Sequence, residues 1–347
     1  MFRKKYIIIP TNLNYQKIVF SALCITLNTQ PMLDNIRLQF KDKSLVEKWF
    51  RENEEKFPPY QMKRIFTTEG EFNTYPIVAD IENLKLRICD KIAYLEGSIH
   101  KLYNYLSYND LEEREMGDYD HLKDNNYNDF YYVQCIQAME SLKEFFDGLD
   151  LNDASISELE FGFNLLTERE PSEYKDMNFL LYEYKAPQNN YSKAGNYFNK
   201  FEHSKYAFKV YSKKDQKRLR TNIMRVEIVL KSNHLKDIGI EKYDDLMMVE
   251  NIESLYNFFC EKFENFILID DRQEKPGISR NVLNEMGNYL EPSYWRGRKN
   301  RANTNRIKQH FQKLLRDYDM LTTKEYFKGL INNKFNQLCH GVINEDG

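Results

Sequence analysis

Three segments in the middle of the chain alternate apolar and polar residues with a period of two. They comprise residues 157–164, 205–214 and 222–231. This period is typical of a strand that is buried on one side only. A sheet of such strands is expected to pack its apolar face on helices and to display reactive side chains on the other face. Those polar-face residues are Glu158, Glu160, Asn164, Lys209, Tyr211, Lys213, Arg225 and Glu227.

Hydrophobic patterns along the rest of the chain predict an α+β fold. Alternation indicates strands at 24–27, 35–40, 84–88 and 93–99. Apolar residues at steps of three and four indicate an amphipathic helix over 130–148. We therefore expect a central, mostly antiparallel sheet with helices packed on one face and a helical C-terminal extension.

The chain divides into three predicted parts. Residues 1–75 form an N-terminal α/β segment, in which Ser44 and Glu47 have the spacing of a capping box and start a helix. Residues 76–248 contain the three alternating segments and form the main domain. Residues 249–347 form the helical extension.

Residues 108–129 carry a dense run of acidic side chains within the main domain. Only Arg114 and Lys123 oppose them in charge. Such a run rarely packs, so it predicts an exposed loop that repels DNA locally. The acidic residues are Asp110, Glu112, Glu113, Glu115, Asp118, Asp120, Asp124 and Asp129.

The C-terminal extension combines two predicted helices with a basic stretch between them. Apolar residues from Ile252 to Phe266 indicate the first helix, and Thr322 with Glu325 caps the second. Residues 296–316 between them contain no acid. They are expected to bind nucleic-acid phosphates in a salt-dependent way, although an ordinary solvated helix is the alternative. The basic residues are Arg296, Arg298, Lys299, Arg301, Arg306, Lys308, Lys313 and Arg316.

Composition is consistent with a globular protein. The 347 residues are 41% hydrophobic and 30% charged, and the formal net charge of -3 argues neither for nor against nucleic acid. Five scattered cysteines form no zinc motif and are expected to be reduced, as in the cytoplasm. No apolar run is long enough for a membrane span, so no membrane partner is expected. The absence of Walker, GxGxxG and GxSxG motifs removes support for nucleotide-hydrolysing, dinucleotide-binding and esterase functions.

The polar strand face offers candidate residues for metal-assisted chemistry. If their strands are neighbours, Glu160 and Glu227 converge to hold Mg²⁺ or Mn²⁺, which prefer oxygen ligands. Tyr211 lies between lysines and is a candidate nucleophile, because lysines stabilise a developing phenolate. A solvated sheet face is the alternative for the glutamates. Among the 25 tyrosines, Tyr197 and Tyr206 remain rivals, although Tyr206 falls on the apolar face.

The six histidines show no ligand spacing, and neither HxH nor HExxH occurs. His100 and His203 each flank a predicted strand, and both remain candidates for a supporting role. A structural or solvated role is the alternative for each.

Taken together, the three segments resemble rolling-circle replication initiators. They are similar to the plasmid replication initiation factor family and to the replication proteins of filamentous and other single-stranded DNA phages. The matching motifs are Leu159-Glu160 with Asn164, then Val210-Tyr211-Ser212-Lys213, then Arg225-Val226-Glu227. Two weaker likenesses are Leu95 to Lys101, similar to a Gly-Ser-Leu-His-Lys strand, and Pro292 to Trp295 before the basic stretch.

This resemblance implies an enzyme that nicks DNA and transfers the strand. It makes Tyr211 the nucleophile, which forms a 5'-phosphotyrosine and leaves a free 3'-hydroxyl. It also implies a divalent metal on Glu160 and Glu227, with Asn164 as an auxiliary ligand. The residues implied as charge stabilisers are Lys209, Lys213 and Arg225. The His-hydrophobic-His motif of many nickases is absent, so the ligand set is incomplete, and His100, Glu158 or His203 are candidates to complete it.

The resemblance further implies partners and a setting. The substrate is a single-stranded or supercoiled DNA origin, and residues 76–248 become the nicking domain. A bacterial host helicase and polymerase are the expected partners. Whether the protein forms a homodimer is an open question at this point. The alternatives are a non-catalytic DNA-binding protein on the same scaffold and an unrelated RNA- or partner-binding α/β protein.

Overall fold

The structure of this chain is a computed structural model. It describes residues 33–57, 61–62, 65–66, 72–73, 75–109, 124–191, 197–271, 277–296, 298 and 300–340. The predicted strand at 24–27, the acidic segment 110–123 and Lys299 lie outside the described residues.

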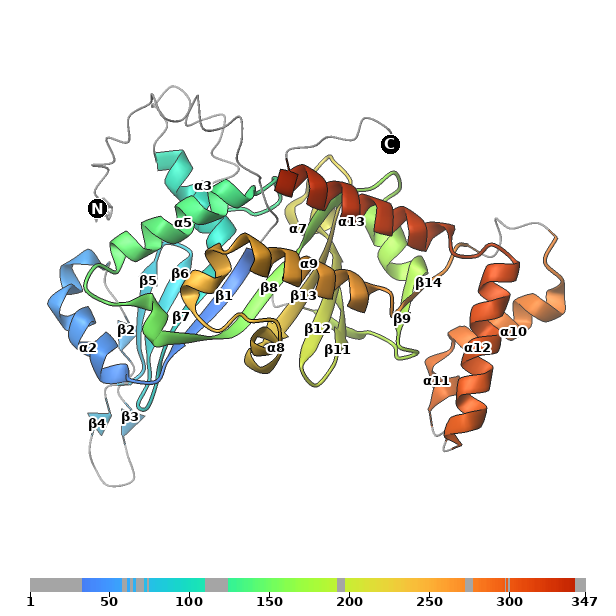
Figure 1. Cartoon of the computed structure of the whole chain (residues 1–347), viewed down its shortest axis with the longest axis horizontal. Coiled ribbons are helices and arrows are strands. Elements are labelled where there is room, and N and C mark those ends of the chain that lie inside the picture. Colours follow the sequence, from blue (N-terminus) through green and yellow to red (C-terminus); the bar gives the residue numbers. More distant parts are fainter. Residues whose placement is uncertain are drawn as a thin grey trace. The chain divides into compact units, whose positions relative to one another are not determined.

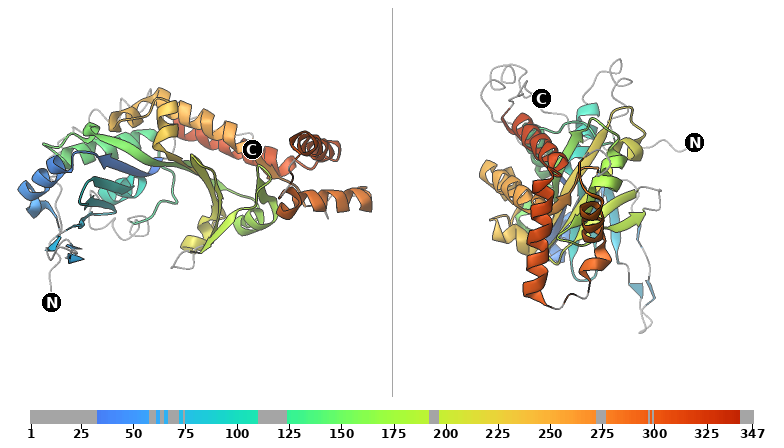
Figure 2. Two further views of the ribbon diagram at one scale, coloured as in Figure 1. Left: turned by 90° about the horizontal axis from the view of Figure 1, so that it is seen from below. Right: turned by 90° about the vertical axis from the view of Figure 1, so that its right-hand side faces the viewer.

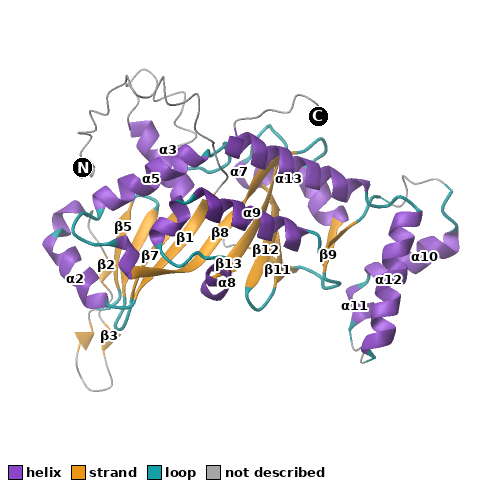
Figure 3. Cartoon of the chain, viewed as in Figure 1, coloured by secondary structure: helices purple, strands orange, loops and turns teal. Residues whose placement is uncertain are grey.

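A ten-stranded sheet forms the centre of the fold (Figures 1 and 3), in the order β10-β11-β12-β13-β8-β1-β7-β6-β5-β2. The defined registers are antiparallel, including those of β1 with β7 and with β8. The predicted α+β fold with a large antiparallel sheet is thus confirmed. The three segments that carry the candidate chemistry are neighbours, as β12-β13-β8. The strands are β1 (Leu33–Phe40), β2 (Gln61–Met62), β5 (Ile77–Ile81), β6 (Leu84–Ile88), β7 (Ala93–Ser98), β8 (Ala154–Leu166), β10 (Gln188–Tyr191), β11 (Tyr197–Glu202), β12 (Tyr206–Ser212) and β13 (Ile223–Lys231).

The chain forms two compact units that interleave along the sequence. The first comprises Met1–Gly162, Val229–Leu255 and Asn336–Gly347, and the second comprises Phe163–Ile228 and Tyr256–Phe335. The divisions fall inside β8 and inside β13, so both strands contribute residues to both units.

The first unit contains helices α2 (Lys43–Glu52) and α5 (Tyr132–Phe145), drawn in blue and green in Figure 2. Aromatic side chains pack between them. The Trp49 ring lies 4.7 Å from the Phe146 ring, and its Nε1 donates to Asp147 O at 2.8 Å. Asp42 caps α2 by accepting from Ser44 N, so the predicted cap at Ser44 is wrong. The reason is that the Asp42 carboxylate accepts from the free N–H group of Ser44, so the helix begins before Ser44.

Helix α3 (Ile99–Asn109) follows β7 directly, and residues 124–131 connect to α5. Asn126 is only 5% exposed and Phe130 is fully buried. Asp124 is exposed as predicted, but the prediction of an exposed loop is wrong for Asn126. Asparagine side chains that bond to one another and to the backbone allow this polar segment to pack.

In the second unit, α9 (Val249–Phe263) and α13 (Thr322–His340) pack through aromatic contacts. The Phe259 ring lies 5.4 Å from Phe208 on β12, and the Tyr256 and Phe335 rings stack at 3.6 Å. The helix predicted to reach Phe266 ends at Phe263. Phe266 instead belongs to a short strand that pairs with a strand distant in the sequence. Its apolar side chain did not reveal this, because a phenylalanine is buried equally well in a helix or in a strand. The short strand pairs are β14 (Phe266–Leu268) with β9 (Phe179–Tyr182), and β3 (Ile65–Phe66) with β4 (Phe72–Asn73).

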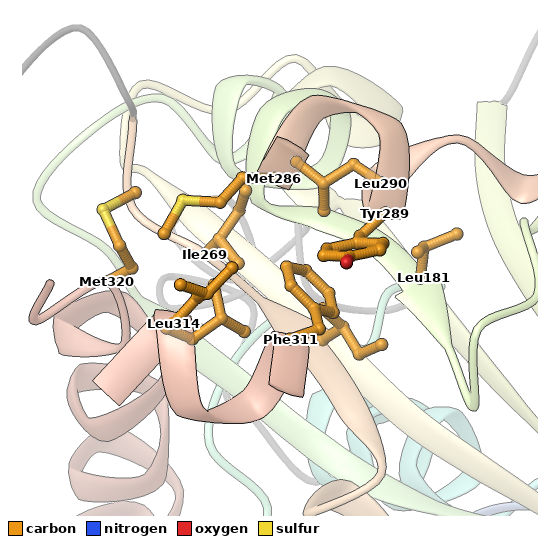
Figure 4. Close-up of a cluster of buried hydrophobic side chains, with 10 residues drawn as sticks. Leu181, Ile269, Met286, Tyr289, Leu290, Phe311, Leu314 and Met320 are labelled. Atoms are coloured by element: carbon orange, nitrogen blue, oxygen red, sulfur yellow. The ribbon is translucent and has the colours of Figure 1, made fainter. Parts of the chain in front are cut away.

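A hydrophobic cluster holds the segment α10 (Arg280–Leu290), α11 (Pro292–Trp295) and α12 (Arg301–Asp317) (Figure 4). The helices contribute Met286, Tyr289 and Phe311, which pack with Leu181 of β9. The opposite side of α12 is exposed. The predicted basic stretch therefore lies on a helix that is anchored by its apolar face.

Shorter helices complete the fold. The predicted strand 205–214 ends at Ser212, whose hydroxyl accepts from Asp215 N and starts a helix at Lys213. Lys213 is consequently a helical residue. The short elements are α6 (Pro171–Glu173), the π-helix η3 (Tyr174–Asn178), α7 (Lys213–Lys217), α8 (Ser232–Asp237) and the 3₁₀ helices η1 (Glu54–Lys56), η2 (Leu151–Asp153) and η4 (Tyr243–Met247). Within the described part of the chain, no helix has the length and apolar character of a membrane span.

Candidate metal centre and active site

Three buried carboxylates converge on neighbouring strands. Oxygens of Asp34 on β1, Glu160 on β8 and Glu227 on β13 all lie within 4.8 Å of one another. Their exposed fractions are 2%, 7% and 1%. Buried carboxylates this close repel one another unless a proton or a cation compensates their charge. Oxygen ligands of this kind suit Mg²⁺ or Mn²⁺, so these residues could hold such an ion.

Sequence analysis placed Glu160 and Glu227 in this centre but missed Asp34. Alternation along β1 assigns Asn35, Arg37 and Gln39 to the polar face, which leaves Asp34 on the apolar one. The pairing of β1 with β8 shifts register between Leu33 and Ile36. Such an irregularity redirects a side chain, and strict alternation does not reveal it. The sequence feature that could have pointed to Asp34 was the Asp34-Asn35 pair at the start of a predicted strand.

Glu227 has three polar partners in the second unit. Arg225 Nε lies 2.6 Å from Glu227 Oε2, and Lys209 Nζ lies 3.3 Å from Oε1. The Tyr211 hydroxyl donates to Oε2 at 3.2 Å. Arg225 is fully buried, so a carboxylate partner offsets the cost of burying its charge. Three of the four predicted catalytic residues, Tyr211, Lys209 and Arg225, therefore contact Glu227.

Tyr211 is half-buried on the polar face of β12. The Lys213 Nζ lies 5.3 Å from the centre of the Tyr211 ring, although Lys213 belongs to α7 rather than to the strand. The ring of Phe198 on β11 lies 6.3 Å from the Tyr211 ring. A cation near the phenol favours negative charge on its oxygen.

Glu158 and Asn164 lie on β8 at either side of Glu160. Glu158 is opposite Arg37 in the register of β1 and β8. Asn164 is four residues beyond Glu160, roughly 13 Å along the strand, and is buried. Glu158 does not belong to the group of three carboxylates. Glu160 itself accepts a hydrogen bond from the Asn35 side chain.

The two candidate histidines lie in separate surroundings. His100 is fully buried on α3, where Nε2 contacts Asn128 Oδ1 at 2.9 Å and the ring stacks on Phe130 at 4.5 Å. His203 stacks on Tyr206 at 4.9 Å, and burial lowers its pKa. Among the described residues, neither histidine joins the carboxylate group.

The rival tyrosines differ from Tyr211 in position. The Tyr206 hydroxyl lies 2.9 Å from the Tyr182 hydroxyl in the aromatic core, as its predicted apolar-face position requires. Burial raises the pKa of Tyr206, which disfavours a phenolate there. Tyr197 is the first residue of β11, and its side chain lies outside the described residues.

The predicted basic residues surround α11 and α12. Arg298 lies over the Tyr294 ring at 3.9 Å, and Lys308 lies over the Tyr184 ring at 4.2 Å. Most of the others extend into solvent from α12 or its start. The exposed basic residues are Arg296, Arg301, Arg306, Lys313 and Arg316.

No protein-family model and no curated protein matches this chain. Among solved structures, the chain is similar to a rolling circle replication initiator protein from Geobacillus stearothermophilus. The two share 13% sequence identity over 76% of this chain and 97% of the other, with a TM-score of 0.36. A likeness this low supports no inference about activity.

Proposed function

We propose that this protein nicks a DNA strand at a replication origin and becomes covalently attached to it through Tyr211. The observation that carries this proposal is the group formed by Asp34, Glu160 and Glu227, together with the hydrogen bond from Tyr211 to Glu227. A nucleophile beside a candidate cation site is the arrangement that phosphodiester cleavage needs.

The proposed reaction is a transesterification. The Tyr211 oxygen attacks the scissile phosphorus and forms a new O–P bond, while the bond from phosphorus to the 3'-oxygen breaks. The DNA 5'-phosphate is then held as a phosphotyrosine, and the released 3'-oxygen takes up a proton. The phenolic proton already points to Glu227 Oε2 and leaves in that direction.

Basic residues on these strands and at the start of α7 stabilise the charge that develops. Lys213 faces the Tyr211 ring and favours the phenolate as its proton leaves. Lys209 and Arg225 hold Glu227 in place through their ion pairs. Lys209 is also partly exposed, which leaves it accessible to a phosphate oxygen.

Asp34, Glu160 and Glu227 hold Mg²⁺ or Mn²⁺ in this proposal. When bound, the ion polarises the scissile phosphate and offsets its negative charge. The carboxylates themselves keep that ion on the polar face next to Tyr211. The partial burial of the centre strengthens their electrostatic effect.

The exposed side of α12 binds the phosphates of the origin DNA. Arg301, Arg306 and Lys313 extend from it without any acid among residues 296–316. This surface supplies affinity, and the metal centre supplies chemistry. The proposal places the protein in the bacterial cytoplasm, where a host helicase and polymerase extend the free 3'-end.

A covalent-adduct assay tests this function. The full chain is incubated with Mn²⁺ and with 5'- or 3'-labelled single-stranded oligonucleotides from its own genetic element, and then resolved on a denaturing gel. We expect the label 3' to the nick to migrate with the protein, and chelator to abolish the band. Tyr211→Phe should remove the band and keep DNA binding, whereas Tyr206→Phe should retain the band.

A band that survives in Tyr211→Phe would move the nucleophile to another tyrosine, with Tyr197 as the first candidate. Tight DNA binding without any adduct in the wild type would instead favour a non-catalytic DNA-binding protein. The basic side of α12 is the observation that supports that alternative.

A further inference from the structure

Both oxygens of the Asp34 carboxylate accept hydrogen bonds from buried neutral side chains. The Asn126 Nδ2 donates to Asp34 Oδ2 at 2.7 Å, and the Ser98 hydroxyl donates to Oδ1. The exposed fractions of Ser98 and Asn126 are 4% and 5%. An amide and a hydroxyl orient the carboxylate without adding a positive charge that would compete with a cation.

The direction of the Ser98 proton is fixed by helix α3. The Ser98 Oγ accepts from Lys101 N at 3.1 Å, as an N-cap side chain does. Because a hydroxyl has one proton, this capping interaction leaves that proton for Asp34. The start of α3 therefore sets the rotation of the Asp34 carboxylate.

The segment that carries Asn126 is fastened to the same helix. Asn104 on α3 donates to Asn125 O at 2.8 Å and to Asn128 Oδ1 at 2.8 Å. His100 contacts that same Asn128 oxygen at 2.9 Å. These bonds fix residues 125–128 against α3, so that the Asn126 amide has little freedom to leave Asp34.

We infer that Asn126 and Ser98 are positioning residues that orient Asp34 toward a divalent cation, and that α3 holds both of them. This inference rests on the proposed metal centre. Buried donors behind a metal ligand typically contribute 10- to 100-fold to metal affinity, because they fix the orientation in which the ligand atom meets the ion. His100 and Asn104 contribute indirectly, through their contacts with Asn128.

Mn²⁺ binding to the full chain tests the inference without any DNA. Isothermal titration calorimetry should show Mn²⁺ affinity falling roughly 10- to 100-fold in Asn126→Ala. Asn152→Ala is the matched control, because Asn152 donates to the Asp244 carboxylate at 3.0 Å in the same unit but outside the centre. It should bind Mn²⁺ as the wild type does.

A pair of Ser98 variants keeps the test decisive if Asn126→Ala folds poorly. Ser98→Ala should weaken Mn²⁺ binding, and Ser98→Thr, which keeps the hydroxyl, should restore it. A general loss of stability would lower the unfolding midpoint without Mn²⁺, whereas a positioning role reduces the Mn²⁺-induced increase in that midpoint.

The two proposals fail in different ways. If the wild type binds no Mn²⁺, the metal centre is wrong and the inference falls with it. If Asp34→Asn loses Mn²⁺ binding while Asn126→Ala and Ser98→Ala keep wild-type affinity, the centre stands and the positioning role is overturned.

Discussion

Arg225 and Glu227 lie two residues apart on one strand and form a fully buried ion pair, with Nε and Oε2 at 2.6 Å. Both side chains point to the polar face of β13, where Glu227 also meets the candidate metal ligands. The same carboxylate thus has a part in the fold and a part in the proposed chemistry. Loss of Arg225 should therefore affect both the stability of the fold and the proposed chemistry.

Arg225→Met should reduce the free energy of unfolding by about 3–5 kcal/mol, because it leaves the Glu227 charge buried without its closest partner. Urea denaturation measures this change. Lys209→Met is the control, since Lys209 contacts the same carboxylate but is 21% exposed and should cost less. Equal effects of the two substitutions would contradict this account.

Mn²⁺ should stabilise the wild-type protein. At a concentration about 100 times its Kd, a ligand that binds only the folded state adds about 2.7 kcal/mol to the free energy of unfolding. Glu160→Gln and Glu227→Gln should each abolish most of this gain, as measured by thermal unfolding with and without chelator. A gain that persists in both variants would place the ion elsewhere.

Gly97→Ala should destabilise the first unit. Gly97 has φ +152°, and a β-carbon there would lie 2.6 Å from Asn83 O and 2.9 Å from Leu84 Cα. The clash and the strained backbone should cost on the order of 1–3 kcal/mol in urea denaturation. Gly329→Ala is the opposite case, because its β-carbon meets nothing within 4 Å on α13. It should stabilise by about 0.5–1 kcal/mol.

Glu264 should contribute pH-dependent stability. Burial raises the pKa of its carboxyl, but hydrogen bonds and charges from Lys328 and Lys324 outweigh burial and lower that pKa below 4.5. A lowered pKa means that the contribution is complete above 4.5 and disappears as the pH falls through the folded-state value. Glu264→Gln should therefore cost about 0.2–1 kcal/mol at neutral pH. The difference in the free energy of unfolding between Glu264→Gln and wild type should vanish in acid. A difference that stays constant as the pH falls would refute this account.

Charge reversal on α12 should weaken DNA binding without changing the metal centre. Arg306→Glu and Lys313→Glu should lower affinity at every DNA sequence, and each lost phosphate contact should reduce the slope of log K against log salt by about 0.9. Fluorescence anisotropy at several salt concentrations measures both. Lys236→Glu, at an exposed site on α8, serves as the control and should leave the slope unchanged.

The strand periodicity of the sequence was sufficient to predict β8, β12 and β13 as strands, but not that they are neighbours in the sheet. Leu159, Phe161 and Phe163 are all fully buried, so Glu160 had to face the other side. Burial of one side forces alternation, which is why this part of the site was accessible from the sequence.

The remaining site residues depend on tertiary contacts that periodicity does not contain. Asp34 reaches the centre through a register shift between β1 and β8. Asn126 follows a run of acids and looks solvated, yet its partner Asp34 lies 92 residues earlier in the sequence. Phe266 fits a helix or a strand equally well until β9 pairs with its segment.

The order of the strands along the chain also determines when the centre is completed during synthesis. Asp34 and Glu160 are on β1 and β8, but Glu227 is on β13, which the ribosome produces much later. A nascent chain that ends before β13 carries two of the three carboxylates and also lacks Arg225. In the proposed enzyme, a truncated product is therefore harmless to the DNA that encodes it, and cleavage waits for a chain that has also acquired its third carboxylate.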